Sequence, residues 1–284
     1  MHKPLNLRTL TPEPLNLLPV LVLVIFLSGC AKLPCSVVVS AEERFTVESA
    51  FQEMLAAQQE CECFCDADVT VTFDLLVRSG TLSGYLEVMP PSYFKFVGLN
   101  PLGQPLIILN TDGRDFQYVV VPEAMGYEGS IRAKAFEKYS PGGFMPEASY
   151  YFLTGRLWSE LTEIFDVGRD PDTTGYWITL VSGKESKYNL VLFEPHEKYL
   201  LRHLVLDRDR SILMDIQYGD YQLTGTKAKE GDRTCRLPGT ITVISESHNG
   251  ILKLSLRDWA TDPFFSEKDF KVKIPDSFER VILE

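Results

Sequence analysis

The chain has 284 residues, of which 45% are hydrophobic and 24% are charged. This composition is that of an ordinary globular protein and excludes a disordered or fibrous chain. Acidic residues outnumber basic ones by 39 to 28, so the formal net charge is −11. This balance argues against nucleic-acid binding and against electrostatic docking on anionic lipid, because both need basic surfaces.

Residues 1–29 have the features of a targeting segment, which does not form part of the folded domain. A basic start is followed by the unbroken apolar run Val20–Leu27 and then by Ser28-Gly29 and Cys30. The run is about half of the roughly 20 residues that a membrane-spanning helix needs. This order resembles a bacterial lipobox, in which residues 1–29 are cleaved and the Cys30 thiol is acylated. A plain signal peptide, or a short buried helix with a free cysteine, is the alternative.

Five further cysteines remain in the expected mature chain, and the local spacing of three of them is unusual. In an extended strand Cys61, Cys63 and Cys65 would project from one face, because side chains alternate with period two. Thiolates so close together suit zinc or copper(I), which makes these three weak candidates for a metal site. Disulfides or inert thiols are the favoured interpretation, since an exported protein meets oxidising conditions. We therefore expect neither a metal nor another cofactor.

The expected elements begin with a tether over residues 30–41 and a helix over 42–59, where apolar residues recur with helical spacing. The next pattern predicts a hairpin of Val69–Ser79 and Thr81–Met89, with its turn at Ser79-Gly80. Further strands are predicted over Ser92–Leu99, Gln104–Asn110, Arg114–Val121, Tyr176–Ser182, Lys187–Phe193, Tyr199–Asp207, Ser211–Tyr218, Thr240–Glu246, Gly250–Asp258 and Phe270–Ile274.

Two helices are predicted in the middle of the chain, over Ser130–Tyr139 and Glu147–Leu161. Connections between the predicted strands are short and local, so we expect an antiparallel sheet. No repeat or long linker divides residues 42–284, which predicts a single, mainly β domain with helices.

Alternation along the predicted strands places aromatic and aliphatic side chains on one face of the sheet and polar ones on the other. The candidates for the apolar face are Phe94, Phe96, Phe116, Tyr118, Val120, Leu252, Leu254 and Leu256. A dry face has to be covered, and the predicted helices are the available cover. The result is either a solid core or a hollow that accepts an apolar ligand, and periodicity does not separate the two.

One turn carries an apolar residue where polar residues are usual. Asn100-Pro101-Leu102-Gly103 fits a type I turn, with Leu102 at the third position. The leucine either protrudes from the tip or folds back over the end of the core.

The stretch Ser92–Leu109, which contains this turn, resembles the LolB-type outer-membrane lipoproteins of the LolA/LolB superfamily. Similarity extends to Met145-Pro146, Tyr151–Gly155, Asp215–Tyr221 and Leu252–Trp259. The resemblance implies an unclosed antiparallel β-barrel, or half-barrel, with a helical lid and an apolar cavity for acyl chains. It also implies that a LolA-type carrier delivers lipoproteins, and that Leu102 enters the inner leaflet of the outer membrane. Two features depart from the family pattern, namely the Cys61–Cys65 segment and the extension beyond Trp259.

The sequence is therefore compatible with three functions. The first is a monomeric, lipid-anchored protein on the periplasmic side of the outer membrane that receives and inserts lipoproteins. The outer membrane is favoured because Ala31 follows Cys30, by resemblance to enterobacterial sorting rules. The second is a lipoprotein of the same fold that binds lipid, glycolipid or a protein partner. The third is an enzyme, which is disfavoured because Glu194–Glu197 lacks the second histidine of a metalloprotease motif and no nucleophile elbow or P-loop is present.

Overall fold

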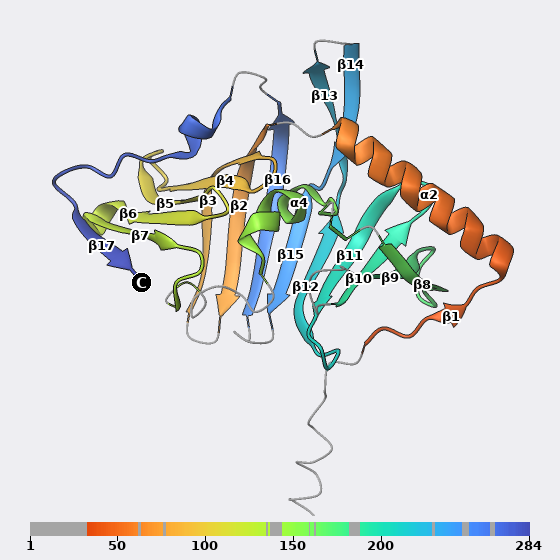
Figure 1. Ribbon diagram of the computed structural model, residues 1–284. Helices are drawn as coiled ribbons and strands as arrows, with labels where there is room; N and C mark the ends of the chain where they lie inside the picture. Colours follow the sequence, from red (N-terminus) through yellow and green to blue (C-terminus); the bar gives the residue numbers. More distant parts are fainter. Residues whose placement is uncertain are drawn as a thin grey trace, which may run out of the picture. The chain divides into compact units, whose positions relative to one another are not determined.

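A single open sheet dominates the computed structural model, which describes residues 33–61, 64–75, 78–134, 136, 144–158, 160–161, 163–181, 188–228, 231–245, 250–261 and 265–284 (Figure 1). Residues 33–284 form one compact unit. The predicted signal segment and Cys30 lie outside the described residues. None of the described helices has both the length and the apolar character of a membrane span.

The strands of the described chain are β1 (Val37–Val38), β2 (Cys65–Leu75), β3 (Arg78–Met89), β4 (Tyr93–Leu99), β5 (Pro105–Thr111), β6 (Asp115–Val120), β7 (Met125–Ser130), β8 (Glu163–Arg169), β9 (Tyr176–Val181), β10 (Tyr188–Glu194), β11 (Tyr199–Leu206), β12 (Ile212–Gly219), β13 (Gln222–Ala228), β14 (Gly231–Leu237), β15 (Thr240–Ser245), β16 (Gly250–Ala260) and β17 (Glu279–Leu283). The helices are α2 (Ala41–Glu60), α4 (Ser149–Thr154) and the 3₁₀ turns η1 (Val121–Glu123), η2 (Pro146–Ala148) and η3 (Glu267–Phe270).

The large sheet has the strand order β1-β8-β9-β10-β11-β12-β15-β16-β2-β3-β4-β5-β6-β7-β17. Its two end strands do not pair with each other, so the sheet is unclosed, as predicted. Neighbouring strands are antiparallel except β17, which runs parallel to β7. Strands β13 and β14 form a separate hairpin (Figure 1).

Helix α2 confirms the prediction for residues 42–59. Ser40 caps its start by accepting a hydrogen bond from the backbone N–H of Glu43 at 3.1 Å. Its buried stripe consists of Val47, Phe51, Met54 and Leu55, and it packs on the sheet with the rings of Phe51 and Phe193 perpendicular to each other. The face of the sheet that α2 and α4 cover is called the inner face below.

Several predicted elements are wrong. The hairpin turn is not at Ser79-Gly80, because both residues lie inside β3, where Gly80 is paired with Phe73. A Cβ at Gly80 would come within 2.8 Å of the Phe73 ring, so the glycine makes room for the ring rather than a turn. The helix predicted over Glu147–Leu161 ends at Thr154, because Gly155 adopts a left-handed conformation with φ 65°. Of the helix predicted over Ser130–Tyr139, Ser130 belongs to β7 and much of the rest lies outside the described residues.

The predicted last strand, Phe270–Ile274, is also wrong, because this segment crosses the outer face of the sheet instead of joining its edge. The Asn110 amide donates to the carbonyl of Phe270 at 2.8 Å, and the Val272 N–H donates to Gln117 at 3.1 Å. Gly126 leaves room for Ile274, since a Cβ there would come within 2.8 Å of it. The real last strand is β17, further along the chain.

The outer face carries a second apolar cluster, on β9 to β12. Its buried members are Trp177, Leu192, Leu204 and Leu206, and Leu33 packs against them. The prediction that one face of the sheet simply meets water therefore needs correction. Val37 and Val38 were expected in the tether, but they pair with β8 as a short edge strand.

A disulfide between Cys61 and Cys235 ties the end of α2 to β14, with a Cα–Cα distance of 5.8 Å. The two cysteines are 174 residues apart in the sequence. A cross-link that closes so long a loop removes much conformational entropy from the unfolded chain.

We predict that Cys61→Ala combined with Cys235→Ala lowers the free energy of unfolding by about 2–5 kcal/mol, measured by denaturant titration. Cys35→Ala is the matched control, because Cys35 is exposed and unpaired. Equal stability of the double variant and the control would show that the bridge does not constrain the fold.

Candidate functional site

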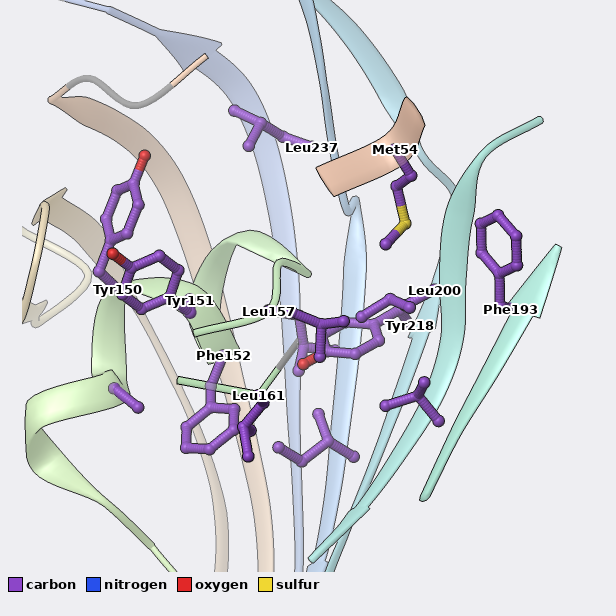
Figure 2. Packing of buried hydrophobic residues seen from close by; sticks show 14 of the residues in the cluster. Met54, Tyr150, Tyr151, Phe152, Leu157, Leu161, Phe193, Leu200, Tyr218 and Leu237 are labelled. Carbon is purple, nitrogen blue, oxygen red and sulfur yellow. The ribbon is translucent and has the colours of Figure 1, made fainter. Parts of the chain in front are cut away.

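The centre of the inner face is filled by protein side chains. Figure 2 shows Met54 of α2 and Phe152 of α4 directed into the same core as Leu200 and Tyr218 of the sheet. Leu157, which follows α4, joins them, and its backbone N–H donates to the Gln58 side chain of α2 at 3.2 Å. This part of the face is a solid core.

The cavity candidates from the sequence share the inner face, as the strand register requires, but they differ in exposure. Leu254 and Leu256 are buried in the central core, and Phe116 is buried against Phe136, so none of the three lines an open hollow. Phe94, Phe96, Tyr118, Val120 and Leu252 are half-buried. These five side chains keep part of their surface exposed because the described helices cover the middle of the sheet and not its whole inner face.

A run of half-buried apolar side chains continues from Leu252 toward the β4–β5 turn. We call it the apolar strip; it comprises Val243, Leu252, Phe73, Val71, Leu82, Ile107 and Val120. Cross-strand pairs join Val243 to Leu252, Leu252 to Phe73, Val71 to Leu82, and Ile107 to Val120. The side chains of Leu82 and Ile107 approach each other over Gly98. A Cβ at Gly98 would come within 2.3 Å of Leu82 and 3.0 Å of Ile107, so the glycine lets these two side chains meet.

The β4–β5 turn lies beside this strip, between Gly98 and Ile107 in the sequence, and holds Leu102 in solvent, where the residue is 84% exposed. The Asn100 carboxamide oxygen accepts hydrogen bonds from the backbone N–H groups of Leu102 and Gln104, both at 2.9 Å. Gly103 completes the turn with φ 78°. The leucine therefore does not fold back over the core, and a polar network inside the turn fixes its position.

Two buried polar groups on the inner face were not anticipated from the sequence. His203 of β11 and Asn189 of β10 lie within 2.9 Å, Nε2 to Oδ1, beneath the ring of Phe152. Burial lowers the pKa of His203 to about 4, because the charged imidazolium would lose its hydration. Within the described part of the chain, His203 Nδ1 and the Tyr218 hydroxyl have no hydrogen-bond partner. The neutral imidazole donates through one nitrogen, so a hydrogen bond to Asn189 leaves Nδ1 as an acceptor.

Arg156 is a buried cation just after α4. Its Nη1 donates to the Tyr150 hydroxyl, and its guanidinium carbon lies 5.5 Å from the centroid of the same ring. Tyr150 is in the first turn of α4, so this contact ties the two ends of the short helix together. Arg156 thus helps to fix the segment that covers the centre of the inner face.

The cysteines do not form the three-thiolate site considered above. Cys61 caps the end of α2 and is bonded to Cys235, while Cys65 is buried at the start of β2. The segment is therefore not one extended strand, and Cys63 lies outside the described residues. Among the residues with described positions, no cluster of three or more His, Cys, Asp or Glu side chains suits a metal ion.

The fold defined by this open sheet and its covering helices is that of LolA-like proteins. A protein domain from Vibrio parahaemolyticus, assigned to outer-membrane lipoprotein sorting, matches 80% of this chain and 96% of its own, with a TM-score of 0.54 and 13% identity. A LolA superfamily protein from Nitrosomonas europaea matches 78% of this chain and 97% of its own, with a TM-score of 0.52 and 12% identity.

A third solved structure with this fold belongs to a DUF1329 family protein from Desulfovibrio piger, with a TM-score of 0.54, 9% identity, and coverage of 80% of this chain and 97% of that one. At the level of sequence, no protein-family model matches the chain. No curated protein matches it either. The likeness thus concerns the fold.

The buried histidine makes stability depend on pH. Its folded pKa of about 4 lies below the ordinary 6.5, so the unfolded chain binds the proton more readily and stability falls as pH falls through this window. We predict that lowering the pH from 7 to 5 costs about 2 kcal/mol at this site, and that His203→Gln loses correspondingly less stability than the wild type. Denaturant titrations of both proteins at the two pH values give this difference, and an identical loss in both would contradict it.

Proposed function

We propose that this protein is a lipid-anchored envelope protein that binds acyl chains on its inner face and passes lipoproteins to the outer membrane, as LolB-type proteins do. The observation that carries the proposal is the continuity between the apolar strip and the exposed Leu102. An acyl chain leaving the strip at Ile107 reaches the β4–β5 turn without crossing a charged surface of the sheet's inner face. The fold shared with the lipoprotein-sorting domain supports this interpretation.

Transfer by such a surface requires no covalent chemistry. Burial of alkyl groups is worth about 0.8 kcal/mol for each CH₂, so a protein that covers more of a chain than the carrier does will receive it. The bilayer covers the chain completely and is the final acceptor. Leu102 serves this last step by entering the inner leaflet of the outer membrane, where its apolar side chain is more stable than in water.

The anchor in this proposal is Cys30, acylated after removal of residues 1–29, with the protein on the periplasmic side of the outer membrane and acting as a monomer. Two or more acyl chains hold a protein firmly on a membrane. Its partners are the acyl chains of lipoproteins and a soluble LolA-type carrier. We propose no catalytic residue and no cofactor.

A second function uses the same fold differently. The filled centre of the inner face favours a smaller ligand, such as a single lipid held along the strip, without insertion of lipoproteins. Lipid that copurifies with the protein, identified by mass spectrometry, distinguishes this case from the first.

We predict that Leu102→Glu leaves the fold intact and strongly reduces delivery of cargo to liposomes, because a carboxylate resists entry into hydrocarbon. The measurement uses a LolA-type carrier loaded with acylated lipoprotein and follows cargo first to this protein and then to the liposomes. Leu223→Glu is the matched control, since Leu223 of β13 is also an exposed leucine, and Leu102→Met keeps an apolar tip.

Normal delivery by Leu102→Glu would show that the turn is only structural. Absence of cargo uptake by the folded wild-type protein would instead favour the lipid-binding function.

A further inference from the structure

Exposed apolar side chains occur at the β1 edge of the sheet. Among the described residues, Val38 is 90% exposed, Phe45 73% and Phe165 65%, and Val37 is exposed beside them. These four residues, here called the tether corner, come from β1, the first turns of α2, and β8, which meet at one edge of the sheet (Figure 1). Val38 pairs with Gly168 and projects from the outer face, whereas Val37 projects from the inner face, where α2 lies. Large apolar side chains that cluster in solvent mark an interaction surface more often than single ones do.

The exposure of Phe165 follows from a β-bulge. Ile164 pairs with Leu180 and Asp166 with Thr179, which leaves Phe165 as the extra residue of β8. A bulge redirects the side chain that it carries, and it also blunts an edge strand against pairing with another strand. On the α2 side, a shallow hollow next to Phe45 is lined by Glu48, Ser49, Gln52 and Ile164.

The charged groups around the tether corner are paired with one another. The Arg44 guanidinium lies 2.7 Å from Glu48 and 3.8 Å from Asp166, and Arg44 also donates to the Phe165 carbonyl at 3.4 Å. The Glu43 carboxylate lies 3.9 Å from Arg169 and accepts a hydrogen bond from the Tyr176 hydroxyl at 2.8 Å. Mutual pairing lowers the cost of bringing these groups near a medium of low dielectric constant.

The chain itself restricts how far this corner lies from the proposed anchor. Val38 is eight positions after Cys30, and an extended chain spans at most about 3.5 Å per position, so the separation is at most about 28 Å. A surface held so close to a bilayer meets it at a high effective concentration. Even a weak affinity for the membrane therefore suffices to keep the corner in contact.

From these observations we propose that the tether corner is a membrane-contact surface, in which Phe45 and Phe165 insert into the interfacial region of the leaflet that holds the acylated Cys30. The proposal rests on the lipid anchor of the proposed function. It assigns the partner as a bilayer, recognised by apolar side chains and not by charge, since the arginines present are already paired. Membrane contact of this kind grows with the apolar area buried.

The test uses the full acylated protein reconstituted in zwitterionic vesicles whose lipids carry brominated acyl chains. Bromine quenches tryptophan fluorescence only at contact range, so Phe45→Trp and Phe165→Trp each report on insertion. Ile282→Trp is the matched control, because Ile282 is 62% exposed on β17, at the other end of the sheet order. Leu102→Trp reports separately on the turn that the proposed function places in the membrane.

We expect loss of most of the fluorescence added at positions 45 and 165, relative to vesicles without bromine, and no loss at position 282. Incorporated protein without quenching at 45 and 165 would overturn the membrane contact while leaving the anchor intact, and would direct attention to a protein partner for this corner. A protein that does not incorporate at all would overturn the anchor, and the contact surface with it. Quenching of the tryptophan at position 102 reports on the β4–β5 turn alone and does not bear on the contact at positions 45 and 165.

A second measurement tests the energetics on the acyl-free polypeptide 31–284, which keeps the whole compact unit from Leu33 to Glu284. Phe45→Ser with Phe165→Ser should weaken binding to the same zwitterionic vesicles by about tenfold for each phenylalanine, because each loses its buried ring area. Ile282→Ser should bind like the wild type. Equal binding of all three proteins would overturn the proposal.

Discussion

A sheet that does not close has to be covered by other parts of its own chain, and this requirement organises the molecule. Most residues that face inward along β9 to β12, β15, β16 and β2 are apolar, and leaving them in water would cost more than the fold can offset. Helix α2 supplies one part of the cover and the short helix α4 supplies another. The disulfide links the end of α2 to the β13–β14 hairpin, and the hydrogen bond from Arg156 to Tyr150 links the two ends of α4.

The described helices cover only part of the inner face. Where α2 and α4 lie, the inner face is a solid core with polar groups as deeply buried as His203. Beyond them, the apolar strip from Val243 to Val120 keeps part of its surface in contact with solvent. The outer face is covered too, by Leu33 at one end and by Phe270 and Ile274 at the other. The strip, the Leu102 turn and the tether corner thus keep apolar surface in contact with solvent.

Elements that depend on local residue patterns can be predicted from the sequence. Features that depend on contacts between distant segments cannot. Helix α2 and the strands β4, β5, β6 and β9 to β12 follow from periodicity within a few residues, and the exposed turn at Leu102 follows from its residue types. The placement of Gly80 inside β3 depends on Phe73 across the hairpin, and the path of Phe270 depends on Asn110. The pairing of His203 with Asn189, and of Cys61 with Cys235, requires the strand register and the fold itself. Strand β17 was missed because a short, charged edge strand has little apolar alternation.

The position of β16 has a consequence for the order of events during synthesis. Strands β2 to β7 form one half of the sheet and β8 to β12 with β15 and β16 form the other, and the two halves are joined by the pairing of β16 with β2. A chain is made from its N-terminus, so β2 emerges early and its partner is almost the last strand to appear. Until then β2 presents an unpaired edge with Val69 and Val71 on its apolar side, next to a half-built core. The two halves of the sheet can therefore join only when nearly all of the protein is present.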